Sequence, residues 1–364
     1  MTDSSEFRTI TQINQATREG VEPAKLQVQI ESIRKKESSN GKPYWELKLR
    51  DHDSALTLRA WSDTDAFFVC ENLKDKDCVE ITADFYQNGS FGIDAKRWQI
   101  APLTEERTAS FLVGSEEMRQ AIEINYDFIC TQISEVKDPR LKRIGETFLE
   151  EFGERFKRTA AARAYHHAYR GGLCAHCAQM MRSALALCQV YTELNQDLII
   201  TGILFHDSGK LWETCPDKND LVIQRELFGE MLGHISIGIE FVNKAWGKLD
   251  SEKAAWSKLQ PPSEQVRIHL LHLVASHHGE LQYGSPIEPK IPEAVALHYI
   301  DNLDARLQMF AENYEKSPLL APQIYERRPP LKVSPIAPLK KFSSEAEEQN
   351  PQVKENSTQT LDSQ

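Results

Sequence analysis

The sequence predicts two successive domains, an all-β barrel followed by an all-α domain. Three observations lead to this prediction. Apolar and polar residues alternate in five short stretches between residues 25 and 100, which is the period of half-buried strands. After Pro102, apolar residues recur every three or four positions, which is the period of amphipathic helices. The length of 364 residues, with 40% hydrophobic residues, is sufficient for two separate cores.

The predicted strands are separated by turn signals. They run through Lys25–Ile30, Tyr44–Leu49, Leu56–Ala60, Val79–Phe85 and Phe91–Ile100. Asn40-Gly41 and Asn88-Gly89 are tight-turn dipeptides between them. Asp63–Leu73 is predicted to be helical and lies between the third and fourth strands. Five strands with a helix at this position is the order of an OB barrel, and a generic antiparallel β domain is the alternative.

The second half of the chain is predicted to be helical. The expected helices are Glu116–Ile133, Leu141–Phe156, Leu173–Tyr191, Asp197–Phe205, Arg225–Trp246, Glu264–Ser276 and Pro292–Tyr314, with Asp138-Pro139 as a helix start. From Ser317 onward the chain holds seven of its 17 prolines and then a Ser/Glu/Gln/Asn-rich run, which is typical of disorder. The predicted organisation is a flexible N-terminus (1–20), the barrel (21–103), a helical linker (104–160), the α domain (161–314) and a disordered, Pro-rich tail (315–364).

Composition excludes several classes of protein. No apolar run approaches the ~20 residues needed to span a bilayer, and the N-terminus lacks the pattern of a secretory signal. Seven scattered cysteines, an odd number, argue against a disulfide framework, so we expect a cytoplasmic chain with no membrane partner. Cys174 and Cys177 form a CxxC without a second pair, and we expect them to be two small residues on a helix. The net charge of −11 argues against coating of nucleic acid by bulk electrostatics.

A set of histidines and aspartates carries the predicted chemistry. The set comprises His176, His206, Asp207, His234, His277, His278 and Asp301. Its members lie on or at the ends of separate predicted helices, so a helical bundle can direct them all to one point. His269 and His272 are expected to be structural, and His298 to lie outside the set.

The residue types predict a divalent transition metal. Imidazoles with a few carboxylates favour Mn, Fe, Co, Ni or Zn over Mg or Ca. Seven candidate ligands exceed the need of one ion that keeps open positions, so we expect two ions per chain with Asp207 as the bridging carboxylate. Two metals ~3.5–4 Å apart activate water and hold the attacking and leaving oxygens of a phosphate.

Longer motifs around these residues resemble the YhaM family of 3′–5′ exoribonucleases, which combine an OB domain with an HD-superfamily domain. The first motif is His166-His167-Ala168-Tyr169-Arg170-Gly171-Gly172-Leu173-Cys174-Ala175-His176. The others are Leu232-Gly233-His234-Ile235-Ser236-Ile237-Gly238, Ser276-His277-His278-Gly279-Glu280-Leu281-Gln282-Tyr283-Gly284-Ser285-Pro286 and the run from Pro292 to Ala305. The resemblance covers roughly residues 20–312.

The resemblance implies Mn(II)-dependent removal of nucleotides from the 3′ ends of single-stranded RNA, with some activity on single-stranded DNA. It implies that His176, His206, Asp207 and Asp301 are the core HD ligands, and that His234, His277 and His278 complete a second metal site. Lys210 matches a lysine that neutralises phosphate charge, so Asp207 and Lys210 are the predicted catalytic residues. This chain departs from the family at Ser208 and in its tail. The partner of the tail and homo-oligomer formation are left open.

The barrel is expected to guide the strand into the active site. An OB barrel binds single strands through a basic groove and aromatic stacking surfaces. Residues 31–50 carry a local surplus of three positive charges, and we expect Tyr44 to face outward and Trp45 to face the core. His166 and His167 are expected to line the substrate cleft. The predicted nucleic-acid-binding residues are Arg34, Lys35, Lys36, Lys42, Tyr44, Lys48 and His167.

Three other functions are alternatives to a 3′–5′ exoribonuclease. An HD phosphodiesterase acting on a small or cyclic nucleotide has no need of a strand-guiding barrel. A di-iron oxygenase uses a related ligand set, but Lys210 and the barrel argue against it. A non-catalytic RNA-binding protein with a relic HD fold is expected to have lost at least one ligand, and none is missing here.

Overall fold

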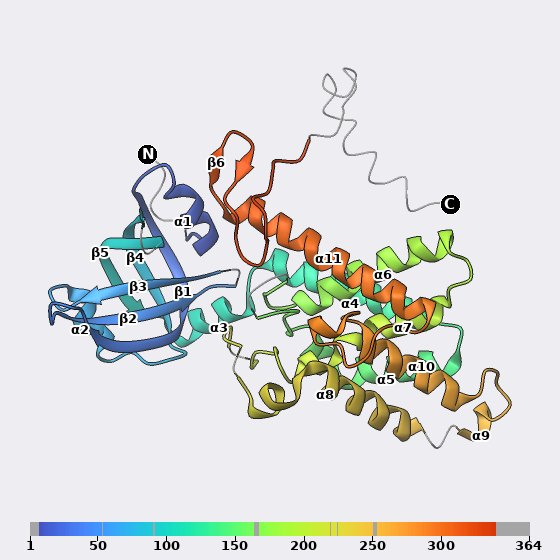
Figure 1. The fold of residues 1–364 in the computed structure, drawn as a ribbon. Coiled ribbons are helices and arrows are strands. Elements are labelled where there is room, and N and C mark those ends of the chain that lie inside the picture. Colours follow the sequence, from blue (N-terminus) through green and yellow to red (C-terminus); the bar gives the residue numbers. More distant parts are fainter. Residues whose placement is uncertain are drawn as a thin grey trace, which may run out of the picture.

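The computed structural model describes residues 7–52, 54–89, 92–163, 167–218, 220–223, 225–249 and 253–339. The chain folds into a β barrel and a helical domain that lie next to each other (Figure 1). No helix in these ranges combines the length and apolar character that crossing a membrane requires.

The barrel is a five-stranded antiparallel sheet with the order β3-β2-β1-β4-β5. Its elements are β1 (Glu22–Glu37), β2 (Pro43–Arg50), β3 (Ala55–Trp61), α2 (Asp65–Cys70), β4 (Cys78–Asn88) and β5 (Gly92–Pro102). The N-terminal half of β1 pairs with β4 and its C-terminal half pairs with β2, with a bulge between Ile30 and Ser32. A bulge bends and twists a strand, and β3 consequently comes to lie against β5. The predicted OB-type barrel, with its helix between the third and fourth strands, is confirmed.

The N-terminus is ordered from Phe7, contrary to the prediction of a flexible segment over residues 1–20. The helix α1 (Ile10–Ala16) begins with a capping box in which the Thr9 side chain and the Gln12 side chain each bind the other's backbone N–H. Ile10 and Ile13 are buried in the barrel core. Residues 1–6 lie outside the described residues.

The helices of the second domain agree with their predicted positions. They are α3 (Glu105–Val113), α4 (Glu116–Glu135), α5 (Pro139–Phe156), α6 (Gly172–Val190), α7 (Gln196–His206), η1 (Ser208–Leu211), α8 (Leu227–Lys248), α9 (Lys253–Trp256), α10 (Ser263–Ser276), η3 (Leu281–Tyr283) and α11 (Pro292–Lys316). Asp138 caps α5 as predicted, by accepting hydrogen bonds from the backbone N–H groups of Arg140 and Leu141.

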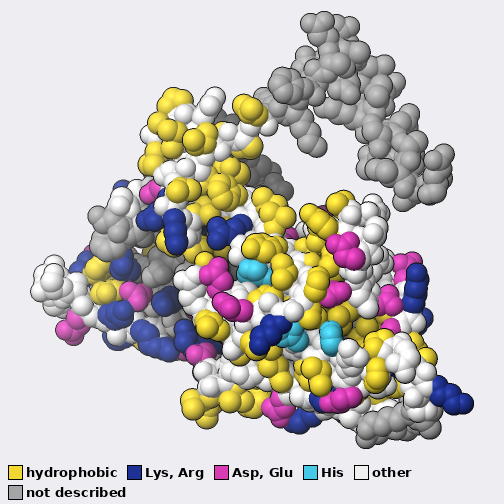
Figure 2. All heavy atoms as spheres, turned by 45° about the vertical axis from the view of Figure 1, so that its right-hand side comes forward, with side chains coloured by type: hydrophobic (Ala, Val, Ile, Leu, Met, Phe, Trp, Pro, Cys, Tyr) yellow, Lys and Arg dark blue, Asp and Glu magenta, His cyan; other side chains and the backbone are white. Residues whose placement is uncertain are grey.

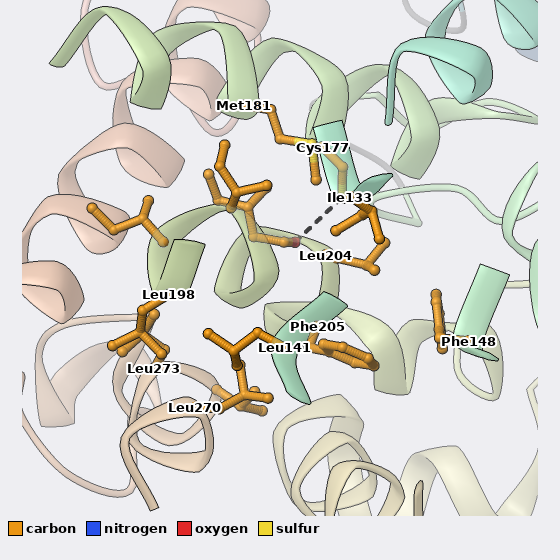
Figure 3. Packing of buried hydrophobic residues seen from close by; sticks show 14 of the residues in the cluster. Ile133, Leu141, Phe148, Cys177, Met181, Leu198, Leu204, Phe205, Leu270 and Leu273 are labelled. Atoms are coloured by element: carbon orange, nitrogen blue, oxygen red, sulfur yellow. Dashed lines mark hydrogen bonds between the residues drawn. The ribbon is translucent and has the colours of Figure 1, made fainter. Parts of the chain in front are cut away.

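The core of the helical domain surrounds α7 (Figure 3). Every residue of α7 from Leu198 to His206 is buried, and a helix that is apolar on all sides needs neighbours on all sides. Phe148 of α5 stacks edge-to-face on Phe205 of α7, with a ring-centroid distance of 5.1 Å. Ile133 of α4 belongs to the same core. The segment 104–160, predicted to be a linker, therefore supplies two helices of the α domain itself.

Part of the predicted disordered tail is folded. After α11, β6 (Leu319–Ala321) and β7 (Ile324–Tyr325) form a small hairpin. Asn313 Nδ2 donates to the Glu326 carbonyl at 3.1 Å, and Tyr314 Oη donates to the Ile336 carbonyl at 3.0 Å. The prediction of disorder is therefore wrong for residues 315–339, and residues 340–364 lie outside the described residues.

Specific polar contacts fix the barrel to the helical domain. The Leu221 backbone N–H donates to Oε1 of Gln29, a barrel residue that is 1% exposed, at 2.8 Å. Lys76 Nζ lies 2.8 Å from an Asp220 carboxylate oxygen. The C-terminal end of α11 reaches α1 of the barrel domain.

Phe148→Ala should destabilise the helical domain by about 3–5 kcal/mol, because it leaves a cavity beside α7. Urea unfolding followed by helical circular dichroism measures the change. Ile124→Ala, on the exposed face of neighbouring α4, should change the free energy of unfolding by less than about 0.5 kcal/mol. Equal effects of the two substitutions would mean that α5 is not part of this core.

Candidate metal centre

The seven predicted ligands come from five helices and lie close together. His176 comes from α6, His206 and Asp207 from the end of α7, His234 from α8, His277 and His278 from the end of α10, and Asp301 from α11. The ligand atoms of His176, His206 and Asp207 lie within 4.8 Å of one another, as do those of His234, His277 and His278. Histidine side chains reach the surface on one face of the helical domain, with hydrophobic side chains around them (Figure 2).

The Asp207 carboxylate lies between the two groups of histidines. Its Oδ2 is 3.2 Å from His206 Nε2, while its Oδ1 is 3.5 Å from His234 Nε2 and 3.6 Å from His277 Nε2. Lys210 Nζ lies 2.7 Å from Oδ2. One carboxylate oxygen therefore faces each histidine group, which is the arrangement that a bridging ligand requires.

Asp301 belongs to the same group of ligands as His206, because it contacts His176. Its Oδ1 lies 3.3 Å from His176 Nε2. Burial would raise the pKa of Asp301, but the hydrogen bond with His176 and the charges of the nearby imidazoles lower it below its ordinary value. The carboxylate is therefore ionised and able to act as a ligand.

Local backbone requirements hold His234 against Asp207. A Cβ on Gly209 would lie 1.9 Å from the His234 carbonyl oxygen, so only glycine lets η1 approach α8 this closely. Gly233 has a φ of 69°, a left-handed conformation that interrupts α8 directly before His234. These two backbone requirements explain why glycine occurs at position 209, close to the HD dipeptide, and at position 233, directly before His234.

Four buried polar atoms at the centre have no hydrogen-bond partner among the described residues. They are Nε2 of His206, His234 and His277 and Oδ1 of Asp207. Buried polar atoms are normally paired, because an unpaired one costs ~1–3 kcal/mol. These atoms are all electron-pair donors that face one space, so they fit a site for metal cations.

Each histidine of the centre is oriented by its other ring nitrogen. An acceptor on Nδ1 makes that nitrogen the proton donor and leaves the lone pair on Nε2. Backbone carbonyls are the acceptors for His206 (Ile203, 2.7 Å), His277 (Val274, 2.8 Å) and His278 (Tyr283, 2.9 Å). Carboxylates are the acceptors for His234 (Glu213, 2.9 Å) and His176 (Asp304, 2.7 Å).

Asp304 connects His176 to His167. The same Asp304 oxygen, Oδ2, lies 2.7 Å from His176 Nδ1 and 3.0 Å from His167 Nε2. His167 is only 6% exposed, and its Nδ1 lies 3.2 Å from Tyr169 Oη. A strand cannot reach a buried ring, so the geometry disagrees with the expectation that His167 binds nucleic acid and gives it a positioning contact instead. His166 lies outside the described residues.

Electrostatics favour the protonation states of metal ligands. Burial would raise the pKa of Asp207, but the charges of Lys210 and His206 hold it well below its ordinary value. Burial lowers the pKa of both His277 and His278, which keeps these rings neutral.

His176 is the exception. Burial would lower its pKa, but hydrogen bonds and charges from Asp301 and Asp304 raise it to about 9. The same carboxylates attract a metal cation, which competes with the proton for Nε2.

The remaining histidines and the CxxC have structural contacts. His272 Nε2 accepts from the Lys290 backbone N–H at 2.9 Å, and His298 Nδ1 lies 2.9 Å from the His277 carbonyl oxygen. Cys174 and Cys177 are buried in α6, where burial raises the pKa of Cys174 to about 12. Such a thiol is protonated and is a poor metal ligand.

The cations predicted to bind nucleic acid on the barrel are largely paired. Arg34 binds Asp75 through two hydrogen bonds, Lys35 lies 3.7 Å from Glu71, Lys36 lies 2.7 Å from Glu46 and Lys42 lies 2.7 Å from Asp63. Three of these carboxylates come from outside residues 31–50. The surplus of positive charge in residues 31–50 is therefore mostly neutralised by ion pairs in the folded chain. Lys48 is exposed, and among the described residues it is the one predicted cation without an ion pair.

A groove of about 1030 Å³ on the barrel offers a different surface. Its lining includes Lys42, Arg59, Trp61, Tyr86, Lys96 and Arg97. Tyr44 packs on Trp61 with a centroid distance of 4.7 Å, and Lys96 Nζ lies 4.6 Å from the centroid of the Tyr86 ring. Tyr44 was expected to face outward, and it packs on one ring of this groove. Trp61, Tyr86 and Lys96 were not predicted, because they come from strands outside residues 31–50.

Comparison with known proteins agrees with this architecture. The HD domain model matches residues 173–306. The chain is 31% identical over 288 residues to "3'-5' exoribonuclease YhaM" of Bacillus subtilis (strain 168), covering 79% of this chain and 86% of the relative. The proteins of the same name from Geobacillus sp. (strain WCH70) and Bacillus pumilus (strain SAFR-032) are each 30% identical, over 79% of this chain and 83% and 86% of their own lengths. The chain therefore belongs to the YhaM family, and its metal centre lies in an HD domain.

Proposed function

We propose that this chain is a metal-dependent 3′–5′ exoribonuclease that hydrolyses phosphodiester bonds of single-stranded RNA. The observation that carries the proposal is the set of four buried electron-pair donors, Nε2 of His206, His234 and His277 and Oδ1 of Asp207, that have no hydrogen-bond partner among the described residues. The family supports the substrate, because the relatives are named 3'-5' exoribonuclease. The intact donor set also argues against the alternative of a non-catalytic RNA-binding protein.

The seven predicted residues are proposed to hold two ions. His176, His206, Asp207 and Asp301 form one group of donors, and Asp207, His234, His277 and His278 form the other. The mixture of imidazoles and carboxylates suits a divalent transition metal, and we propose Mn(II), as the family resemblance implies. Divalent ions bound here supply Lewis acidity toward phosphate oxygens and lower the pKa of water.

Two residues of this chain are proposed to act directly. Asp207 holds negative charge between the two histidine groups, where cations need it most. Lys210 is half-buried, and although burial would lower its pKa, the Asp207 carboxylate raises it and keeps the side chain an ammonium. An ammonium at this position offsets charge that develops on the phosphate during hydrolysis.

The barrel groove is proposed to hold the single strand. Tyr86 and Trp61 offer faces for base stacking, which is worth ~1–3 kcal/mol per base and does not depend on base identity. Lys96 supplies positive charge beside the Tyr86 ring. We retain Tyr44 from the predicted set, since Arg34, Lys35, Lys36 and Lys42 would each have to break an ion pair to bind phosphate.

RNA labelled at its 5′ end should shorten as a ladder, and RNA labelled at its 3′ end should release labelled mononucleotide from the first turnover. Both reactions should stop after chelation and recover when Mn(II) is added back. Asp207→Asn should lose metal and activity together, because the amide removes the charge that holds the cations. Elemental analysis of the same samples should give close to two ions per parent chain.

Labelled oligonucleotides, in place of labelled mononucleotide, as the first products from the 3′-labelled RNA would contradict the exonuclease. Cleavage of a cyclic dinucleotide in preference to a 20-nucleotide RNA would favour the small-nucleotide phosphodiesterase. Full activity with one bound ion would contradict the two-metal site alone.

Lys210→Ala should keep the metals and lower the single-turnover rate at saturating RNA by about 10²–10³-fold, the typical cost of removing one electrostatic donor. Lys210→Arg, which keeps the charge, should recover part of this loss. A fully metallated Lys210→Ala variant that reacts at the parent rate would contradict the role of Lys210.

Asp304→Asn should weaken metal affinity or activity by about 10–100-fold, as expected for a carboxylate that orients a metal-binding histidine. Mn(II) titration followed by electron paramagnetic resonance separates weaker binding from a slower reaction. Glu315→Gln, an exposed change of the same kind on the same helix, is the control. Parent-like affinity and rate in Asp304→Asn would show that His176 needs no orientation by this carboxylate.

A further inference from the structure

A second basic surface lies between the barrel and the end of α11. It is a cleft of about 340 Å³ whose walls come from α1, the β2–β3 region, the segment before α6, α11 and residues 328–331. Four cationic side chains line it, Arg50, Arg163, Lys316 and Arg328, against a single carboxylate, Glu312. This local excess of positive charge stands out in a chain with a net charge of −11.

The positive charge of the cleft is only partly neutralised. Arg50 Nε lies 3.8 Å from Glu31, which is a weak ion pair, and Arg163 pairs with Glu230. Arg328 is exposed, and among the described residues its guanidinium makes no ion pair.

A further guanidinium lies beside Arg328. Arg18 donates to the Ser317 carbonyl at 2.9 Å and to the Lys316 carbonyl at 2.5 Å. Arg328 is held near this point, because its backbone N–H donates to Asn313 Oδ1 at 2.9 Å and the Ser317 N–H donates to the Asn313 carbonyl at 2.9 Å. Burial, and then the charge of Arg328, lower the pKa of Arg18, while the charge of Glu326 raises it.

The cleft shares a wall with the metal centre. Asp301 and Asp304 lie on α11, and Glu312 and Lys316 follow at intervals that keep them near the same face of this helix. Glu312 lies eleven positions after Asp301, which corresponds to about 16 Å along the helix axis at ~1.5 Å per residue. On the opposite wall, Tyr169 lines the cleft and contacts His167, which binds Asp304.

This separation suits a strand better than a small anion. About 16 Å corresponds to roughly five nucleotides at the ~3.4 Å stacking rise of one strand, or to fewer if the strand is extended. A chain whose 3′ end is at the metals therefore has its upstream phosphates at the cleft. Lys and Arg side chains gather between the barrel and the histidine-bearing face (Figure 2), as such a path requires.

We propose that the cleft between the barrel and α11 binds the sugar-phosphate backbone of RNA several nucleotides upstream of the 3′ end, with Arg328 and Arg50 as the principal contacts. The proposal rests on the exoribonuclease function proposed above. It connects the barrel groove to the metal centre and predicts that affinity increases with RNA length until the strand reaches the cleft.

The test compares Arg328→Gln, Arg50→Gln and the double variant with the parent protein. Fluorescence anisotropy in chelator, where the strand is not cut, measures binding of 5′-labelled oligouridylates of 4, 8, 12 and 20 nucleotides over a range of salt concentrations. Arg119→Gln removes an equivalent charge from the exposed face of α4 and is the matched control. Circular dichroism verifies that each variant is folded.

Each cleft variant should weaken binding of the 12-nucleotide RNA by about 5- to 30-fold, as expected for the loss of a hydrogen bond to a charged group. The loss should be smaller for the 4-nucleotide RNA. The slope of log affinity against log salt should become shallower by about 0.7 for each phosphate contact removed. Arg119→Gln should match the parent in both quantities.

The proposal would be overturned by parent-like affinity and salt slope in Arg328→Gln and in the charge-reversed Arg328→Glu. A loss that is equal at every RNA length would also overturn it, because that result indicates general damage. Metal-dependent degradation by the parent is measured separately with the same RNAs. If degradation is absent while the length-dependent binding loss is present, the nuclease function fails and the cleft stands as an RNA-binding surface.

Discussion

The buried carboxylate of Asp207 is the constraint on which the rest of the helical domain depends. An ionised carboxylate that is 3% exposed is costly unless positive charge or donors surround it. Lys210 supplies one positive charge at 2.7 Å, yet Oδ1 and the Nε2 atoms of three histidines still have no hydrogen-bond partner among the described residues. The domain therefore encloses an arrangement that is complete only with cations. Metal binding and the stability of this centre are consequently coupled.

The fold meets this demand by combining an apolar helix with polar groups at its end. The helix α7 is buried along its length, which anchors it firmly, and its C-terminus delivers His206 and Asp207 to the centre. The close approach at Gly209 brings η1 against α8, and the break at Gly233 turns His234 toward Asp207. Hydrogen bonds to Nδ1 then set the ring orientations. Rigid packing, not loop flexibility, determines the ligand positions.

Periodicity and motifs predicted the helices and the ligand set because both depend on local sequence. The N-terminal segment was mispredicted as flexible although Thr9-Ile10-Thr11-Gln12 carries a capping-box signal. The orienting carboxylates Glu213 and Asp304 carry no signal of their own, because an acidic residue in a turn or on a helix is usually solvated. Their roles depend on which histidine they meet in space, and His167 was misplaced for the same reason.

Charge is the property that sequence windows represent least faithfully. The surplus in residues 31–50 is cancelled by Asp75, Glu71 and Asp63, which approach from elsewhere in the barrel. Conversely, the positive surface of the cleft forms only after folding, because Arg50, Arg163 and Arg328 each lie more than a hundred residues from the next along the chain. Such a surface exists only if the two domains hold a defined orientation. The hydrogen bond between Gln29 and Leu221 helps to fix this orientation. It therefore contributes to the proposed RNA path as much as the cations that line the path.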